Sequence, residues 1–119
     1  MCIRDSLIIV DVKATSRNNF DWSETFKKYE YAKAYKRQLE MYQWLFKKNG
    51  FKVSNEGFLV YFNGLRNEPM FNKQLKFELH LISLECNDEW VEETIIEAKK
   101  LLQINDLPCL LYTSDAADE

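Results

Sequence analysis

The sequence predicts an α/β protein whose elements follow in the order β-α-β-β-α. Three observations predict this class: an apolar, β-branched run at residues 7–14, a helical spacing of apolar residues over 31–48, and a strictly alternating segment at 75–81 before a second helical pattern. The strand–helix–strand unit that opens this order is typical of α/β domains.

The first strand is predicted at residues 7–14 (LIIVDVKA), and the polar, irregular segment 15–30 after it is predicted to be a loop. In the first half of the strand, apolar residues occupy both alternating faces, as expected for a central strand that is covered on both sides. Phe20 and Trp22 lie in the predicted loop. Their rings are able to stack on nucleic-acid bases, but hydrophobic anchoring of the loop is the simpler interpretation.

A helix is predicted over residues 31–48, ending at Asn49-Gly50, where Gly50 suits a C-cap. The residues whose spacing predicts its buried stripe are Tyr31, Ala34, Tyr35, Gln38, Met41, Tyr42 and Leu45. The residues expected on its solvent side are Lys33, Lys36, Glu40, Gln43 and Lys47. A second strand is predicted at 58–62, closed by Asn63-Gly64.

The third strand is predicted at residues 75–81 (LKFELHL), where strict alternation indicates one buried apolar face and places His80 on the solvent face. His80 is therefore interpreted as structural rather than as a ligand. Asn87-Asp88-Glu89 then offers a helix N-cap and an acidic first turn. The apolar face of this last helix is predicted from Trp90, Val91, Ile95, Ala98, Leu101 and Leu102.

The composition excludes several classes of protein. The chain has 119 residues, of which 46% are hydrophobic and 29% charged, with only 3 Gly and 2 Pro; this balance excludes disordered, collagen-like and low-complexity chains. No apolar run approaches the roughly 18 residues of a membrane span. The start has no basic segment followed by an apolar core, as a secretory signal needs. We therefore expect a cytoplasmic protein with no membrane partner.

Both ends of the chain match translated sequencing adapter, which has to be excluded from reasoning about the fold. Residues 1–6 (MCIRDS) match a transposon mosaic-end adapter, residues 109–114 (CLLYTS) match its reverse complement, and residues 115–119 continue into the adjoining adapter. One adapter in opposite orientations at the two ends is very improbable by chance. We therefore expect residues 1–6 and 109–119 to be adapter-derived and residues 7–108 to be a partial domain, cut on both sides.

The charges of residues 7–108 balance overall but are unevenly distributed. Residues 13–52 carry ten basic and four acidic side chains, whereas residues 78–106 carry two lysines and eight acidic side chains. The first half therefore suits contact with a polyanion, although two solvated helix faces explain the same charges equally well. The one cysteine of residues 7–108 is Cys86, and a lone cysteine is more often a small buried apolar residue than a reactive thiol.

Asp11 and Lys13 form the first candidate site. They are two residues apart on a predicted strand, so both side chains leave the same face. A carboxylate and an ammonium on an otherwise apolar strand are costly to cover unless they are paired or used. Such a pair suits hydrolysis of a phosphate ester, in which a carboxylate holds Mg²⁺ and a lysine neutralises charge or orients water. By itself Asp-x-Lys is a weak motif, since charged residues at the solvated end of a strand give the same pattern.

Gln38 is the second candidate, because it lies in the middle of the apolar stripe predicted for the helix, with Tyr42 one turn later. Amphipathic patterning favours Leu at that position, and a buried amide needs a hydrogen-bond partner. If the helix packs on its strand, Gln38 faces the end of that strand, near Asp11 and Lys13. The alternative is a glutamine at the edge of the stripe that bonds to backbone.

Residues 8–15 (IIVDVKAT) followed by 38–42 (QLEMY) resemble the PD-(D/E)XK nuclease superfamily, in its RecB-like exonuclease branch. That branch has an acid-x-Lys strand followed by a helix bearing Gln-x-x-x-Tyr, and the resemblance covers residues 7–64. It implies a partial restriction-endonuclease-like mixed sheet and a DNA-cleaving hydrolase that uses Mg²⁺ or Mn²⁺. Asp11 and the carbonyl of Val12 would be metal ligands and Lys13 the catalytic lysine, while Gln38 and Tyr42 would support the site and contact DNA.

The resemblance also implies features that residues 7–108 lack. The family has a further metal-binding Asp on the preceding strand, and everything before Leu7 is expected to be adapter, so we expect the chain to have impaired activity. Many relatives carry an iron–sulfur cluster whose cysteines lie largely beyond this region; none of its ligands is expected here, and Cys109 is not counted as one. The alternative hypothesis is a non-catalytic nucleic-acid-binding or assembly module of the same fold.

Overall fold

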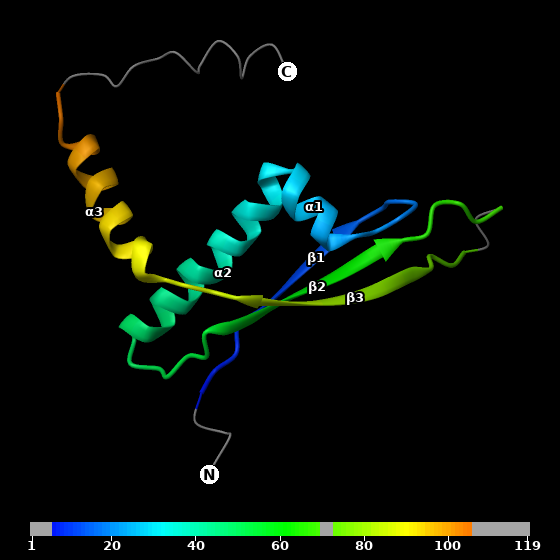
Figure 1. The fold of residues 1–119 in the computed structure, drawn as a ribbon, viewed down its shortest axis with the longest axis horizontal. Coiled ribbons are helices and arrows are strands. Elements are labelled where there is room, and N and C mark those ends of the chain that lie inside the picture. The colour runs from blue at the N-terminus through cyan, green and yellow to red at the C-terminus, as the bar shows by residue number, and fades with distance from the viewer. Residues whose placement is uncertain (1–5, 70–72, 106–119) are drawn as a thin grey trace. The chain divides into compact units, whose positions relative to one another are not determined.

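The computed structural model describes residues 6–69 and 73–105, and its elements are shown in Figure 1. In chain order they are β1 (Val10–Thr15), α1 (Trp22–Lys28), α2 (Glu30–Lys48), β2 (Glu56–Gly64), β3 (Phe77–Glu85) and α3 (Glu89–Leu102). The chain divides into a first unit, Met1–Asp88, and a second unit, Glu89–Glu119. Except for Ser6, the segments predicted to be adapter-derived lie outside the described residues.

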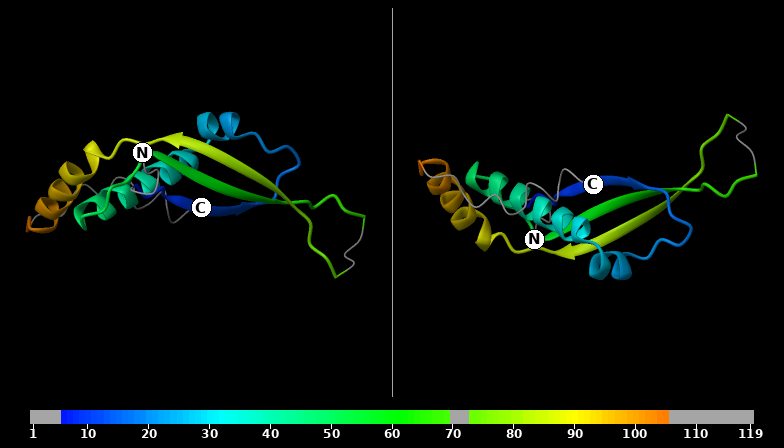
Figure 2. Two further views of the ribbon diagram at one scale, coloured as in Figure 1. Left: turned by 90° about the horizontal axis from the view of Figure 1, so that it is seen from below. Right: turned by 90° about the horizontal axis from the view of Figure 1, so that it is seen from above.

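The described strands form a three-stranded mixed sheet in the order β1-β2-β3. β1 pairs with β2 in parallel, with Lys13 opposite Tyr61, and β2 pairs with β3 antiparallel, with Tyr61 opposite His80. The strands lie side by side and twist across one another (Figure 2). The chain is therefore a mixed α/β protein in which β1, α2 and β2 form a strand–helix–strand unit, as the sequence predicts.

β1 differs from its predicted form. It begins at Val10 rather than Leu7, which makes only an isolated bridge to Val53. In the described sheet β1 is an edge strand, and only one of its faces is half-buried, because Val10 and Val12 are 53% and 60% exposed. The prediction of a central strand covered on both sides is therefore wrong for the part of the chain that the structure describes.

Helix α1 occupies part of the segment that the sequence reading assigned to a loop, so that prediction is wrong for Trp22–Lys28. Asp21 is its N-cap: the carboxylate accepts hydrogen bonds from the backbone N of Ser23 at 2.8 Å and from its hydroxyl at 2.7 Å. These hydrogen bonds hold the pKa of Asp21 below its ordinary value. The cap, the acidic Glu24 in the first turn and two lysines in the last turn form a start and stop signal that the short length of the helix obscured.

Helix α2 forms as predicted, but it buries a different face. Its buried side chains are Ala32, Leu39, Glu40 and Gln43, whereas Tyr31, Met41, Tyr42 and Leu45 of the predicted stripe are exposed. The buried face is centred on Leu39 rather than on Gln38, which is a rotation of about 100°. Glu40 and Gln43 turn inward because neighbouring segments present backbone groups that need partners. Gln43 donates to the carbonyl of Ser54 at 3.0 Å, and Glu40 accepts from the backbone N of Asn87 at 3.1 Å.

Strand β3 also presents the opposite face from the one predicted. Leu79 and Leu81 are 63% and 66% exposed, while Ile82 is buried and His80 lies against the ring of Phe20, with centroids 4.6 Å apart. The reason is the register with β2, which pairs Ile82 with the fully buried Leu59. Since side chains alternate along a strand, this choice sends the other alternating set outward. The prediction that His80 faces solvent is therefore wrong.

The core of the first unit lies between α2 and one face of the sheet. Its buried residues are Leu39, Leu59, Tyr61, Ile82 and Cys86, and Ile9, Phe20, Trp22, Tyr35 and Leu84 pack around them. Cys86 is a free, buried thiol, as predicted, and burial raises its pKa. The packing of Phe20 and Trp22 confirms that these rings anchor the segment after β1.

The second unit begins with α3, whose predicted existence is confirmed. Acidic Glu89 and Glu92 lie in its first turn and Lys99 and Lys100 in its last turn, an arrangement that complements the helix dipole. Among the helices of residues 6–69 and 73–105, none has the length and apolar character needed to cross a membrane.

Candidate active site

The side chains of Asp11 and Lys13 lie on the half-buried face of β1. They form an ion pair between Asp11 Oδ2 and Lys13 Nζ at 2.9 Å, and each side chain is about one fifth exposed. The side chain of Val12 between them points to the opposite face. The strand therefore presents one carboxylate and one ammonium together toward the helical layer.

Gln38 connects this pair to Tyr42. Its Oε1 accepts a hydrogen bond from Lys13 Nζ at 2.9 Å, and its Nε2 donates to the Tyr42 hydroxyl at 2.7 Å. The four side chains predicted from the sequence thus form one continuous series, Asp11–Lys13–Gln38–Tyr42. Gln38 lies at the edge of the buried face of α2, but its partners are side chains rather than backbone.

Tyr35 is a further member of the site that the sequence reasoning assigned only to the apolar stripe. Lys13 Nζ lies over its ring, 4.4 Å from the centroid. Tyr35 precedes Gln38 by three residues, so both lie on one side of α2. This three-residue spacing is the feature of the sequence that indicates Tyr35 lies beside Gln38. The ammonium of Lys13 is consequently held by a carboxylate, an amide oxygen and an aromatic face.

The backbone of Val12 points toward the open edge of the described sheet. The backbone N of Phe58 on β2 donates to the carbonyl of Ile9 at 3.0 Å, so residue 9 directs its polar groups toward β2. Because these groups alternate sides along a strand, residue 11 also faces β2, whereas Val12 directs its carbonyl away from it. The carbonyl of Val12 therefore lies at the outer edge of β1, while the carboxylate of the preceding Asp11 lies on its half-buried face.

The contacts of the Asp11 carboxylate and the number of oxygen donors near it matter for metal binding. Asp11 Oδ2 is buried, receives no hydrogen bond of good geometry from the described residues, and is paired with Lys13. Residues 6–69 and 73–105 contain no group of three or more His, Cys, Asp or Glu side chains placed to hold a metal. Within those ranges, the oxygen donors at this position are one carboxylate and one backbone carbonyl.

Tyr61 lies opposite Lys13 on β2 and is 3% exposed. Its hydroxyl has no hydrogen-bond partner among the described residues. Burial raises the pKa of Tyr61 well above its ordinary value, Tyr35 and Tyr31 add to the shift, and the guanidinium of Arg17 opposes it. A buried polar atom without a partner is uncommon in proteins and needs an explanation.

We expect one of the six tyrosines to ionise later than the others when the protein is titrated with alkali. The folded state favours the neutral phenol of Tyr61, so its contribution to stability is complete below about pH 10 and is lost as the pH rises further. Ultraviolet absorbance of tyrosinate measures this, and Tyr61→Phe should remove the late step. A wild-type titration in which all tyrosines ionise together would contradict the burial of this hydroxyl.

Asn63 and Arg17 were not among the predicted site residues. The sequence predicts a turn at Asn63-Gly64, but Asn63 is the penultimate residue of β2 and is 1% exposed. Its Oδ1 accepts from the backbone N of Arg17 at 2.8 Å, and its Nδ2 donates to the Arg17 carbonyl at 2.9 Å. The signal available in the sequence was its alternation with Leu59 and Tyr61, which places all three on one face.

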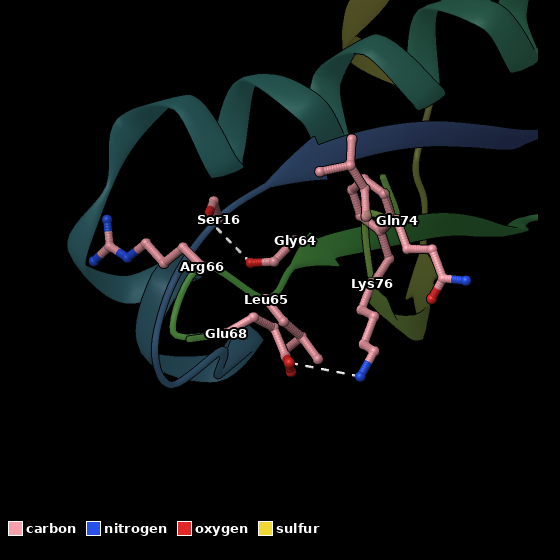
Figure 3. Close-up of a pocket in the computed structure, with 9 residues that line it drawn as sticks. Ser16, Gly64, Leu65, Arg66, Glu68, Gln74 and Lys76 are labelled. Atoms are coloured by element: carbon pink, nitrogen blue, oxygen red, sulfur yellow. Dashed lines mark hydrogen bonds and ion pairs between the residues drawn. The ribbon is translucent and has the colours of Figure 1, made fainter. Parts of the chain in front are cut away.

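A separate pocket of about 270 Å³ lies near the ends of β1 and β2 that are joined by the hydrogen bond from the Ser16 hydroxyl to the Gly64 carbonyl (Figure 3). Its lining includes Glu68 and Lys76, which form an ion pair at 3.5 Å. None of the predicted site residues lines it. The pocket therefore plays no part in the candidate site.

Comparisons of the chain with protein-family models, with curated proteins and with solved structures give no match.

Proposed function

We propose that the chain is part of a metal-dependent DNA nuclease of the PD-(D/E)XK type, in its RecB-like branch, which hydrolyses phosphodiesters with Mg²⁺ or Mn²⁺. The observation that carries the proposal is the position of Lys13 Nζ, which lies 2.9 Å from both Asp11 Oδ2 and Gln38 Oε1. The sequence resemblance assigns roles to these same three residues. The parallel pairing of β1 with β2 around α2 is further support, because it agrees with a partial restriction-endonuclease-like sheet.

The donor set fits a hard divalent cation that shares its coordination with substrate. Mg²⁺ prefers oxygen ligands and is commonly bound through one or two carboxylates together with substrate phosphates and water. The oxygens that would hold it are the carboxylate of Asp11 on the half-buried face of β1 and the carbonyl of Val12 at its outer edge. When bound, the cation would polarise the phosphodiester and lower the pKa of an attacking water. The family resemblance implies a second metal-binding Asp on a preceding strand.

Lys13 has the geometry to stabilise charge on a phosphate. An ammonium has three N–H donors, and two partners of Lys13 are Asp11 and Gln38. A phosphate oxygen or water molecule that bonds to this ammonium would share it with Asp11, Gln38 and the ring of Tyr35. Because its partners fix the ammonium before substrate arrives, little reorganisation is needed when negative charge develops.

Gln38 and Tyr42 support this position from α2. The amide of Gln38 is oriented by its two hydrogen bonds, since its oxygen faces Lys13 and its nitrogen faces Tyr42. The Tyr42 hydroxyl accepts from Gln38 and keeps its own proton for donation, and Tyr42 is 37% exposed. We infer that Gln38 is a positioning residue and that Tyr42 contacts the backbone of DNA.

Asp11→Asn tests the proposal directly. In the full chain with Mn²⁺ and DNA oligonucleotides, we expect Mn²⁺ binding, detected by electron paramagnetic resonance, that strengthens when DNA is present, together with slow cleavage resolved on gels. Asp11→Asn should weaken both by more than the roughly 10–100-fold cost of losing an outer-shell partner. Glu30→Gln is the control, since Glu30 is an exposed carboxylate of α2 that pairs only with Lys33 and Arg37 among the described residues.

Three outcomes of this experiment separate the hypotheses. If Asp11→Asn cleaves DNA with metal at the wild-type rate, Asp11 is excluded as the metal ligand. DNA binding without cleavage by the wild-type chain, unaffected by Mn²⁺, would support the alternative of a non-catalytic nucleic-acid-binding module. If the wild-type chain binds neither DNA nor Mn²⁺, both proposals are removed.

A further inference from the structure

A second pocket, of about 220 Å³, lies next to the candidate site at the end of β1. It shares Tyr35 with the surroundings of Lys13, and Thr15, on the same face of β1 as Lys13, also lines it. Its volume is below the roughly 300 Å³ at which sites for drug-sized molecules begin. The pocket is therefore suited to one small group of a longer ligand.

Arg17 gives this pocket a fixed positive charge. Its backbone is held on both sides by the buried amide of Asn63. Its guanidinium donates to the hydroxyls of Thr25, at 3.3 Å, and Tyr31, and it lies 4.6 Å from the centroid of the Tyr29 ring. Within the described residues Arg17 forms no ion pair with a carboxylate, and two of its five N–H donors have partners.

Tyr61 contributes a buried donor without a partner. Its side chain lines the pocket, it is 3% exposed, and its hydroxyl makes no hydrogen bond among the described residues. Leaving such a group unsatisfied destabilises the folded state. A ligand acceptor that reached this hydroxyl would satisfy it. If instead the hydroxyl has no function, Tyr61→Phe should bind the ligand with unchanged affinity.

The lining as a whole is selective for an acceptor-rich anion. Its lining residues include Arg17 and the tyrosines Tyr31, Tyr35 and Tyr61, and they include no Asp or Glu. Phosphate oxygens are acceptors that arginine binds with charge-assisted hydrogen bonds.

We propose that this pocket binds a phosphate group of a nucleotide next to the one at Asp11, with Arg17 and Tyr61 as its principal contacts. The inference rests on the proposed function and extends it, because it assigns the track of the nucleic-acid strand along β1, from Asp11 past Lys13 to Arg17. Both a strand phosphate and the 5′-phosphate of a released mononucleotide have the required chemistry.

The experiment measures binding of thymidine 5′-monophosphate, inorganic phosphate and thymidine to the full chain by isothermal titration calorimetry. We expect the monophosphate to bind and thymidine not to bind. Arg17→Gln should weaken binding at least about tenfold, which corresponds to about 1.4 kcal/mol, and Arg17→Lys should lose less. Arg37→Gln is the matched control, because Arg37 is exposed, pairs with Glu30, and does not line the pocket.

Tyr61→Phe keeps the inference testable if the Arg17 variants fold poorly. We expect it to bind the monophosphate several-fold more weakly while its thermal stability stays equal or rises, because it loses an unsatisfied buried hydroxyl. Unchanged affinity in Tyr61→Phe and Arg17→Gln, or equal binding of thymidine and its monophosphate, would overturn the phosphate site.

A comparison of oligonucleotide cleavage with these titrations separates the two proposals. Phosphate binding that depends on Arg17 in a chain that neither binds Mn²⁺ nor cleaves DNA would leave the pocket standing and remove the nuclease assignment. Cleavage that depends on Asp11 but not on Arg17 would remove only the pocket. If the strand phosphate is the ligand, Arg17→Gln also weakens oligonucleotide binding. If the pocket binds only a released mononucleotide, Arg17→Gln leaves oligonucleotide binding unchanged.

Discussion

Lys13→Ala is expected to abolish metal-dependent cleavage of DNA while leaving DNA binding largely intact. The ammonium of Lys13 is the group placed to meet charge that develops on a phosphate, and removing one preorganised donor of this kind costs about 10²–10³-fold in rate. Binding should persist because ten basic residues lie within residues 13–52 and nine remain in the variant. Cleavage is measured under single-turnover conditions and binding by fluorescence anisotropy.

Lys33→Ala is the control for charge alone. Lys33 belongs to the same helix as Gln38, is 45% exposed at its side chain, and pairs with Glu30 at 3.3 Å. It should retain wild-type cleavage. If Lys13→Ala cleaved DNA at the wild-type rate, Lys13 would have no part in the mechanism; if it lost DNA binding to the same extent as cleavage, its role would be attraction of the substrate.

Leu39→Ala is expected to destabilise the fold by about 2–5 kcal/mol, because Leu39 is fully buried against Leu59 and Cys86 in the core. Met41→Ala should cost less than about 1 kcal/mol, since Met41 is 40% exposed. Urea denaturation followed by circular dichroism gives both values. The sequence pattern alone predicts the reverse order, so a larger loss in Met41→Ala would show that α2 packs through its predicted stripe.

Apart from α1, which was predicted to be loop, the element order was predictable because it depends on local signals, and so was the grouping of Asp11, Lys13 and Gln38. β-branched runs and helical spacing identified β1, α2, β2, β3 and α3. The Asp11–Lys13 pair followed from the two-residue period of a strand, and Gln38 stood out as an amide among apolar residues. These are properties of a segment and its immediate neighbours, so the sequence contains them in full.

The packing faces were less predictable because they depend on partners from elsewhere in the chain. The inward rotation of Glu40 and Gln43 is explained by backbone groups at Asn87 and Ser54, which sequence periodicity does not represent. The inverted face of β3 is explained by its register with β2. In α2 and in β3 alike, more than one face carried apolar residues, and the tertiary contacts decided which face was buried.

The pairing of Asn63 with both backbone groups of Arg17 has a thermodynamic consequence for recognition. A long, flexible side chain on a free loop loses conformational freedom when it captures a ligand, and affinity falls accordingly. Here the amide at the end of β2 fixes the peptide of Arg17 when the sheet itself forms. The backbone part of the ordering penalty is therefore incurred once, during folding, and a phosphate that arrives later meets an arginine whose backbone is already fixed.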